Sequence, residues 1–255
     1  MRGGKGKTLM LEAANETRTV DPRAVDRVLV VGAGTMGSGI AQVVADAGIQ
    51  TILFDADPAS LERGLSSISA RWERSVATGR RTSESVANAR EHLASGSLQI
   101  AADVDLIVEA IVEKLGAKVQ LFETLADIAP PDTVFASNTS SISISALGRA
   151  SGRPGRLVGM HFFNPVPVLP LVEIVRGLET SEETVSQAVA FAASIGKTPL
   201  VVNDSPGFVA NRILLPMINE AVFTLQDGVA TRETIDEVMK LGMSHPMGPL
   251  ALADL

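Results

Sequence analysis

The chain has 255 residues, 45% of them hydrophobic, which is enough for one large domain or two smaller ones around a buried core. A formal net charge of −7 argues against general nucleic-acid binding, and no apolar run approaches the roughly 18 residues of a membrane span. The chain contains no cysteine, which excludes disulfides and thiolate chemistry and fits a reducing compartment, read here as the cytoplasm. Its three histidines are scattered without metal-ligand spacing, so no metal is expected.

Residues 1–25 are expected to form a disordered tail. Basic residues lie among its glycines, and it has no periodic apolar pattern. The apolar run Leu9–Leu11 is much shorter than the about 7–15 residues of a secretory signal core, and the acids that follow argue against a mitochondrial transit peptide. The sequence therefore predicts that the fold begins at Asp26.

A strand, a glycine-rich loop and a helix follow one another at the start of the fold. The short apolar run Arg27–Val31 is typical of a parallel strand that is covered on both faces. It leads into Gly32-Ala33-Gly34-Thr35-Met36-Gly37, after which the apolar period becomes helical until Gly48, a residue that favours a helix end. A second strand over Thr51–Phe54 ends at Asp55.

This loop has the spacing of a dinucleotide-binding site. Gly32 allows the tight turn, Gly34 lets the backbone approach a pyrophosphate, and Gly37 lets helix and strand pack closely. The helix N-terminus would supply N–H groups and a partial positive charge to the phosphates. Asp55 is expected to bind the adenosine ribose and would repel a 2′-phosphate, which favours NAD over NADP. The alternative is a βαβ unit that binds no nucleotide.

A helical hairpin is predicted next, because the helical pattern from Pro58 to Ser95 is broken near Thr78-Gly79-Arg80. Its helices are expected over Ser60–Ala77 and Thr82–Ala94. The hairpin carries four arginines in an acidic chain, and a solvated basic face is their ordinary interpretation. These arginines are Arg71, Arg74, Arg80 and Arg81.

Further alternation of strands and helices predicts a doubly wound, mainly parallel sheet of the Rossmann type. Ala102–Val112 is expected to be a buried strand, Lys114–Ile128 an amphipathic helix, and Thr133–Ser137 the next strand. The polar run Asn138-Thr139-Ser140-Ser141 follows the carboxyl end of that strand. In open α/β sheets this edge is where ligands bind.

The stretch Arg156–Glu173, RLVGMHFFNPVPVLPLVE, predicts a catalytic pair. Three prolines between positions 165 and 170 exclude a helix and stiffen the backbone, so two extended segments can lie side by side. This would bring His161 and Glu173 together, and a carboxylate beside an imidazole fixes its tautomer and stabilises its charged form. Such a pair is a general base. The alternative is a buried histidine satisfied by a backbone carbonyl.

The chain changes character at Asp204. Long helices are expected over Phe208–Leu225 and Thr231–Leu241, the second capped by its first residue and stopped by Gly242. We therefore predict a nucleotide-binding domain over 26–203 and a helical domain over 204–255. A domain of about 50 residues is too small to bury a core alone, so it must pack on the first domain or on another subunit.

Six blocks together resemble the 3-hydroxyacyl-CoA dehydrogenase family, closest to the short bacterial 3-hydroxybutyryl-CoA dehydrogenases. The resemblance spans about residues 26–255. The blocks are VGAGTMGSGIA (31–41), DLIVEAIVEK (105–114), ASNTSSISI (136–144), GMHFFNPVPVLPLVEIVRG (159–177), DSPGFVANRILLPMINEA (204–221) and MKLGMSHPMGPLALADL (239–255).

The resemblance implies reversible, NAD-linked oxidation of an L-3-hydroxyacyl-CoA to the 3-ketoacyl-CoA. By this resemblance His161 is the general base and Glu173 orients it. Ser140 hydrogen-bonds the reacting oxygen, and Asn211 reaches the site from the helical domain. The residues that the family's pattern places on NAD, besides the glycine loop, are Asp55, Glu113, Lys118, Ser140 and Asn164.

Several of these residues also have structural interpretations. Ser140 and Asn138 could cap the following helix, and Asn211 could be satisfied by its own helical turn. Glu113 and Lys118 could form a surface pair on one helix.

The chain departs from the family's pattern in two ways. Family members usually continue for several tens of residues past the position of Leu255, and that part completes the helical domain and forms most of a homodimer contact, so the helical domain is expected to be incomplete. The CoA-contacting serine and lysine known in some members do not match here. We therefore hypothesise that Arg71, Arg74, Arg80 or Arg81 holds the CoA phosphates instead.

Two other functions are compatible with the same motifs. One is an NAD dehydrogenase built on the same plan that acts on a free hydroxy acid or sugar acid. The other is a truncated, inactive chain that still binds NAD.

Overall fold

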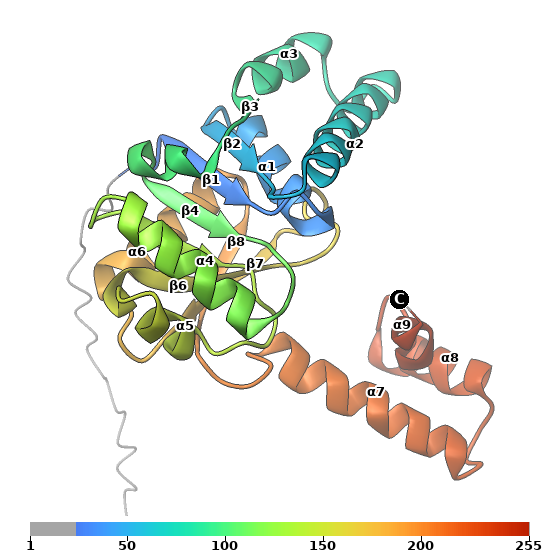
Figure 1. The fold of residues 1–255 in the computed structure, drawn as a ribbon. Coiled ribbons are helices and arrows are strands. Elements are labelled where there is room, and N and C mark those ends of the chain that lie inside the picture. Colours follow the sequence, from blue (N-terminus) through green and yellow to red (C-terminus); the bar gives the residue numbers. More distant parts are fainter. Residues whose placement is uncertain (1–23, 255) are drawn as a thin grey trace, which may run out of the picture.

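The structure is a computed structural model that describes residues 24–254, so the predicted tail over residues 1–25 lies outside it except for its last two residues. Within this part of the chain, eight strands form one sheet in the order β3-β2-β1-β4-β5-β6-β7-β8 (Figure 1). The strands are β1 Arg27–Val31, β2 Gln50–Phe54, β3 Leu93–Ser95, β4 Leu106–Glu109, β5 Val134–Ser137, β6 Leu157–Phe162, β7 Leu171–Arg176 and β8 Thr198–Asn203.

All neighbouring strands are parallel except β6 and β7, which are antiparallel. The predicted doubly wound, mainly parallel sheet is therefore confirmed. The helices that connect or flank its strands are α1 Thr35–Asp46, α2 Pro58–Ala77, α3 Ser83–Glu91, α4 Leu115–Ile128, α5 Ile144–Ala150 and α6 Glu182–Ser194. Short 3₁₀ turns lie at Leu98–Asp103 and Pro154–Arg156.

The apolar strands are buried because helices cover both faces of the sheet. Along β1, Val28 and Val30 pack into a core with α1, α2 and α6, whereas Leu29 and Val31 pack into a second core with α4 and α5. Successive side chains of a strand point to opposite faces, so a strand covered on both sides needs apolar residues throughout. Because β1, β2, β4, β5 and β6 run parallel, their carboxyl ends lie together at one edge of the sheet, called here the ligand edge.

The hairpin insertion is confirmed, but its second helix is shorter than predicted. Helix α3 ends at Glu91, and Leu93–Ser95 forms the edge strand β3 instead of continuing the helix to Ala94. The open edge of β2 explains this, because it pairs with β3 in parallel and the Thr51 N–H donates to the His92 carbonyl at 2.8 Å. A similar shortening affects the strand expected over 102–112, which is regular only within β4.

After β8 the chain forms helices α7 Ala210–Gln226, α8 Arg232–Met243 and α9 Pro249–Ala253, called here the helical module (Figure 1). Thr231 caps α8 as predicted, but the helix runs through Gly242 and ends where Ser244 adopts a left-handed φ of 58°. No helix within residues 24–254 is long and apolar enough to cross a membrane. The predicted domain boundary at residue 204 stays a prediction.

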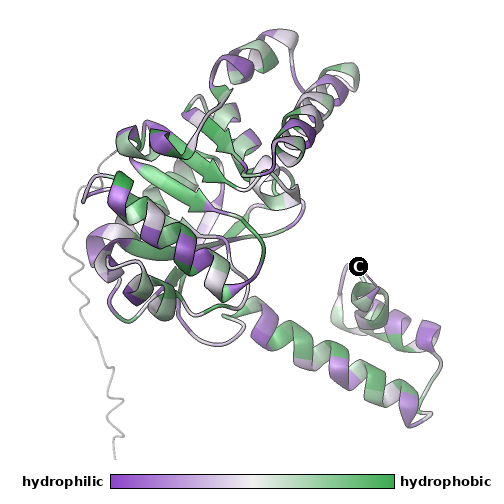
Figure 2. Cartoon of the chain, in the orientation of Figure 1, coloured by the Kyte–Doolittle hydropathy of each residue, from purple (hydrophilic) through white to green (hydrophobic). Residues whose placement is uncertain are grey.

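The helical module buries very little of its own apolar surface. Its core consists of Ala221, Ile235 and Leu250, with Ala230 against them. Hydrophobic residues recur along α7 and remain outside this core (Figure 2). The exposed large hydrophobic residues of α7 and α8, called here the apolar face of the module, are Ile213, Leu215, Val222, Phe223, Leu225, Val238, Leu241 and Met243.

Residues 204–209 connect the sheet to the helical module as a tightly held strap. The antiparallel β7 and its parallel neighbour β8 place the end of β8 at the sheet edge opposite the ligand edge, so the strap has to return along the sheet. The Asp204 carboxylate accepts hydrogen bonds from the Ser143 hydroxyl and from the amide and hydroxyl of Ser145, all at 2.7–2.8 Å. Burial opposes the charge of Asp204, but these hydrogen bonds keep its pKa below the ordinary value. Phe208 is buried and adopts a φ of 49°.

Candidate active site

His161 on β6 and Glu173 on β7 lie directly opposite each other across the antiparallel pair. The distance between His161 Nδ1 and Glu173 Oε2 is 2.8 Å, and both side chains are less than a tenth exposed. The predicted juxtaposition is therefore present, and the backbone carbonyl of the alternative interpretation is not the partner of His161 Nδ1. The Pro-rich turn between the strands creates this register.

The pair determines which nitrogen of His161 can act as a base. An ionised carboxylate only accepts hydrogen bonds, so Nδ1 carries the proton and Nε2 carries the lone pair. No described residue hydrogen-bonds Nε2. The ring is also held by aromatic neighbours, because the Phe163 ring lies 4.6 Å and the Phe208 ring 5.7 Å from it between centroids. The arrangement suits an imidazole that takes a proton at Nε2.

The second oxygen of Glu173 binds the start of helix α7. Glu173 Oε1 accepts hydrogen bonds from the Val209 N–H at 3.2 Å and the Ala210 N–H at 3.0 Å. These N–H groups belong to a helix N-terminus, where a carboxylate is favourable. One carboxylate therefore contacts both the histidine and the helical module.

The loop after β5 brings Ser140 to the same edge. Helix α5 is capped by Ser143, and Asn138 Oδ1 accepts the Phe162 N–H at 2.9 Å, so neither Ser140 nor Asn138 caps that helix. Asn211 Nδ2 donates to the Ser140 carbonyl at 3.3 Å rather than to its own helical turn. The Ser140 hydroxyl has no hydrogen-bond partner among the described residues.

Glu113 fastens this loop from the other side. Its Oε1 accepts hydrogen bonds from the Ser140 N–H at 3.0 Å and from the Thr139 hydroxyl, and its Oε2 lies 3.1 Å from Lys118 Nζ. Burial disfavours the charge, yet the Thr139 hydrogen bond and the Lys118 ammonium leave the pKa of Glu113 below its ordinary value. Glu113 is therefore ionised at neutral pH.

Lys118 and Glu113 are not the surface pair that the structural interpretation would require. Lys118 is 1% exposed and also contacts the fully buried Glu109, with 2.5 Å between Nζ and Oε1. Sequence reasoning missed Glu109. The available signal was an acidic residue inside the apolar run LIVEAIV, where a charge is costly unless it is paired.

The glycine loop fits a dinucleotide. Gly32 has a φ of +105°, and a Cβ on Gly37 would lie only 1.7 Å from the Gly32 carbonyl oxygen. A Cβ on Gly34 would meet nothing within 4 Å, so the backbone there borders open space. No side chain caps α1 and no acid lies in its first turn, so its N–H groups are available to phosphates. These features match an NAD pyrophosphate site.

Asp55 lies beside this loop at the end of β2, as predicted. Its Oδ2 accepts the Ala33 N–H at 2.8 Å and its Oδ1 accepts the Asp57 N–H at 2.9 Å. Asn164 lies on the exposed turn between β6 and β7. That turn is braced, because Lys197 Nζ donates to the Leu169 carbonyl at 2.9 Å and also to that of Val166. Burial lowers the pKa of Lys197.

The four hairpin arginines differ in their contacts. Arg71 binds α1 through the Gln42 side chain and through the Ser38 carbonyl at 3.2 Å, while Arg81 forms an ion pair with Asp46. These two arginines therefore hold the hairpin on helix α1. The guanidinium groups of Arg74 and Arg80 are exposed and make no hydrogen bond or ion pair within residues 24–254.

Comparison with known proteins agrees with this geometry. A family model described as 3-hydroxyacyl-CoA dehydrogenase, NAD binding domain, matches residues 27–205, and one described as the C-terminal domain matches residues 207–255. The chain belongs to the 3-hydroxyacyl-CoA dehydrogenase family. The resemblance found in the sequence is confirmed, as are the expected NAD cofactor and the expected class of enzyme, an NAD-dependent oxidoreductase.

Relatives of this family are similar over most of their length. The chain is 51% identical over 231 residues to a probable 3-hydroxybutyryl-CoA dehydrogenase of Bacillus subtilis, covering 90% of this chain and 80% of that protein. It is 45% identical to a 3-hydroxybutyryl-CoA dehydrogenase of Bradyrhizobium diazoefficiens, covering 90% and 79%. The crystal structure of (S)-3-hydroxybutyryl-CoA dehydrogenase from Ralstonia eutropha superposes with a TM-score of 0.88 at 43% identity, covering 91% and 82%.

Two alanine substitutions in the glycine loop should affect different properties, one the affinity for NADH and the other the melting temperature. Gly34→Ala is expected to keep the melting temperature, because the φ of −66° suits alanine and the new Cβ meets no atom within 4 Å. It should weaken NADH binding by 10-fold or more, on the order of 1.4 kcal/mol, because the Cβ occupies the space of the pyrophosphate. Gly37→Ala should instead lower the melting temperature, because its Cβ would overlap the Gly32 carbonyl. Calorimetry and NADH fluorescence titration measure both. Unchanged NADH affinity in Gly34→Ala would place the pyrophosphate elsewhere.

Proposed function

We propose that the chain catalyses the reversible, NAD-dependent oxidation of a short-chain (S)-3-hydroxyacyl-CoA, such as 3-hydroxybutyryl-CoA, to the 3-ketoacyl-CoA. The observation that carries the proposal is the His161–Glu173 pair, whose Nε2 has no partner within residues 24–254, at the sheet edge that also holds Ser140 and the glycine loop. The names of the relatives at 45–51% identity support the short acyl chain.

In this mechanism the residues hold and move a proton. His161 Nε2 takes the proton of the 3-hydroxyl group, and Glu173 stabilises the imidazolium that forms. The Ser140 hydroxyl, which makes no hydrogen bond to a described residue, donates a hydrogen bond to the reacting oxygen. Asn211 on α7 holds the Ser140 loop through the Ser140 carbonyl. Bound NAD would accept the hydride from carbon 3. The cofactor would be held by the loop Gly32–Gly37 and by Asp55, Glu113, Lys118 and Asn164.

The substrate class can be tested directly. NADH oxidation is measured with acetoacetyl-CoA, with longer 3-ketoacyl-CoAs, and with free acetoacetate or a keto sugar acid as controls. We expect turnover with the CoA ester and a kcat/KM for the free acid that is lower by orders of magnitude. Preference for the free acid would favour the alternative dehydrogenase, and absence of turnover with intact NADH binding would favour the inactive NAD-binding chain.

Removal of the proposed base should separate chemistry from cofactor binding. His161→Gln is expected to lower kcat by about 10²–10⁴-fold, because a glutamine amide has no basic nitrogen to take the proton of the 3-hydroxyl group. NADH affinity and melting temperature should stay close to those of the unchanged protein, since the substitution adds no buried charge. Stopped-flow absorbance and NADH titration provide the two measurements. Turnover above about a tenth of that of the unchanged protein would contradict the assignment of the base.

We propose that Arg74 and Arg80, the two hairpin arginines with exposed guanidinium groups, contact the CoA phosphates. Arg80→Glu should raise KM for acetoacetyl-CoA by about five-fold or more, because it removes one charge contact and adds a repulsion. KM for acetoacetyl-pantetheine, which lacks those phosphates, should not change. Arg149→Glu, the same change at an exposed arginine of helix α5 that pairs with Glu179, is the control. An equal rise with both substrates would discard the contact.

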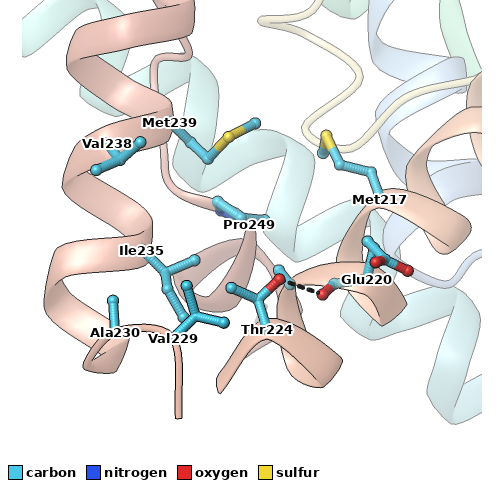
Figure 3. Close-up of a pocket in the computed structure, with 10 residues that line it drawn as sticks. Met217, Glu220, Thr224, Val229, Ala230, Ile235, Val238, Met239 and Pro249 are labelled. Carbon is cyan, nitrogen blue, oxygen red and sulfur yellow. Dashed lines mark hydrogen bonds between the residues drawn. The ribbon is translucent and has the colours of Figure 1, made fainter. Parts of the chain in front are cut away.

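We also propose that two copies of the chain associate through the apolar face of the module. A cavity of about 380 Å³ lies among α7, α8 and Pro249, and Figure 3 shows apolar side chains around it, including Ile235, Val238 and Met239. Leu241→Asp should weaken self-association about 10–100-fold, whereas Leu178→Asp, equally exposed but on the β7–α6 turn, should not. Sedimentation velocity over a range of concentrations checks this. A monomer at all concentrations would refute the homodimer.

A cytoplasmic location completes the proposal. It is supported by the absence of cysteine and by an NAD-dependent chemistry that uses a CoA ester. Fractionation of cells that produce the protein, followed by activity measurement, tests it. Activity found outside the cytoplasmic fraction would overturn it.

A further inference from the structure

Glu109 is a carboxylate in the centre of the sheet, at the carboxyl end of β4. It is 0% exposed, and its neighbours in the strand are apolar. Its Oε1 accepts Lys118 Nζ at 2.5 Å and the Ile111 N–H at 2.8 Å, and its Oε2 accepts the Ser137 hydroxyl at 2.6 Å. Both oxygens are therefore used by three fixed donors, and Glu109 itself has no exposed surface through which to meet a ligand.

Two chains of contacts lead from Glu109 to the catalytic loop. The first passes through Lys118 to Glu113, whose Oε1 accepts the Ser140 N–H at 3.0 Å. The second passes through Ser137, whose hydroxyl accepts the Thr139 N–H at 3.3 Å. Both end on adjacent residues of the loop after β5. That loop carries the hydroxyl that faces the reacting oxygen in the proposed function.

Stability alone does not account for this network. Replacing a buried ion pair by well-packed hydrophobic residues of similar volume is often neutral or stabilising, because desolvation of the charges offsets their attraction. Here two carboxylates, Glu109 and Glu113, share the single ammonium of Lys118. The arrangement fixes the orientation of the Lys118 side chain, whose ammonium contacts Glu109 in the core and Glu113 at the edge of the site.

We propose that Glu109 is a positioning residue for the active site, which acts through Lys118, Glu113 and Ser137 to hold the Thr139–Ser140 segment in place. Only the role of Ser140 in this inference rests on the proposed function. The geometric part, that a buried carboxylate in β4 determines the order of the loop after β5, stands on the contacts themselves.

The test compares Glu109→Gln with a control next to the opposite end of the same two strands, β4 and β5. Glu109→Gln keeps the size of the side chain and removes its charge. Thr133→Val removes a buried hydroxyl that donates to the Val104 carbonyl at 3.0 Å, at the opposite end of β5. Amide hydrogen exchange, melting temperature, kcat and KM for NADH are measured for both variants and for the unchanged protein.

For Glu109→Gln we expect exchange of the amides of residues 139–142 to accelerate at least 10-fold, while amides within β4 and β5 stay protected. We expect kcat to fall by about 10²-fold, because a reacting group displaced by about 1 Å loses that much. Thr133→Val should lower the melting temperature and leave the loop exchange and kcat unchanged. Unchanged loop exchange in Glu109→Gln, or an equal acceleration in Thr133→Val, overturns the proposal.

A second variant covers the case in which Glu109→Gln does not fold. Glu109→Gln combined with Lys118→Met removes both charges and so leaves no unpaired ion in the core. Accelerated exchange of residues 139–142 in this folded variant supports the proposal, and exchange as slow as in the unchanged protein overturns it. If the unchanged protein fails to oxidise NADH with acetoacetyl-CoA, the proposed function fails, while the exchange measurements still decide the role of Glu109.

Discussion

The antiparallel pairing of β6 and β7 is the constraint on which the site depends. Its register sets His161 opposite Glu173. The carboxylate that orients the imidazole is therefore held in place by the strand pairing. A parallel β7 would have entered the sheet from the other edge, and the Pro-rich turn could not have joined the strands. The same reversal turns a Glu173 oxygen toward the start of α7, so the carboxylate that contacts His161 also holds the start of the helical module.

The carboxyl edge of the sheet gathers the remaining groups for one topological reason. Parallel strands end at a common edge, so the glycine loop after β1, Asp55 after β2, Glu113 after β4 and Ser140 after β5 become neighbours although they are far apart in sequence. Polar contacts then join these loops, because Asp55 binds the glycine loop and Glu113 binds the Ser140 loop. Glu109 adds a buried residue to this group of contacts, and it has no exposed surface for a ligand.

Local patterns predicted the parts that local patterns control. The glycine spacing, the Pro-rich turn and the Thr231 cap act over a few residues, and each is present where the sequence indicated it. Which residues become tertiary partners had no such signal. Strand β3 exists because the edge of β2 is open, Arg81 is occupied because Asp46 faces it, and Glu109 is tolerated because Lys118 lies against it. Only the packed structure decides such pairings.

The strap over residues 204–209 has a mechanical consequence for the enzyme. It is anchored at Asp204 by two serines, at Phe208 by burial, and at Ala210 by a carboxylate that also touches the imidazole. A rotation of the helical module about any point before Ala210 has to break at least one of these attachments, whereas bending farther along α7 breaks none. A bend of α7 beyond Asn211 would therefore leave His161 and Glu173 aligned across β6 and β7.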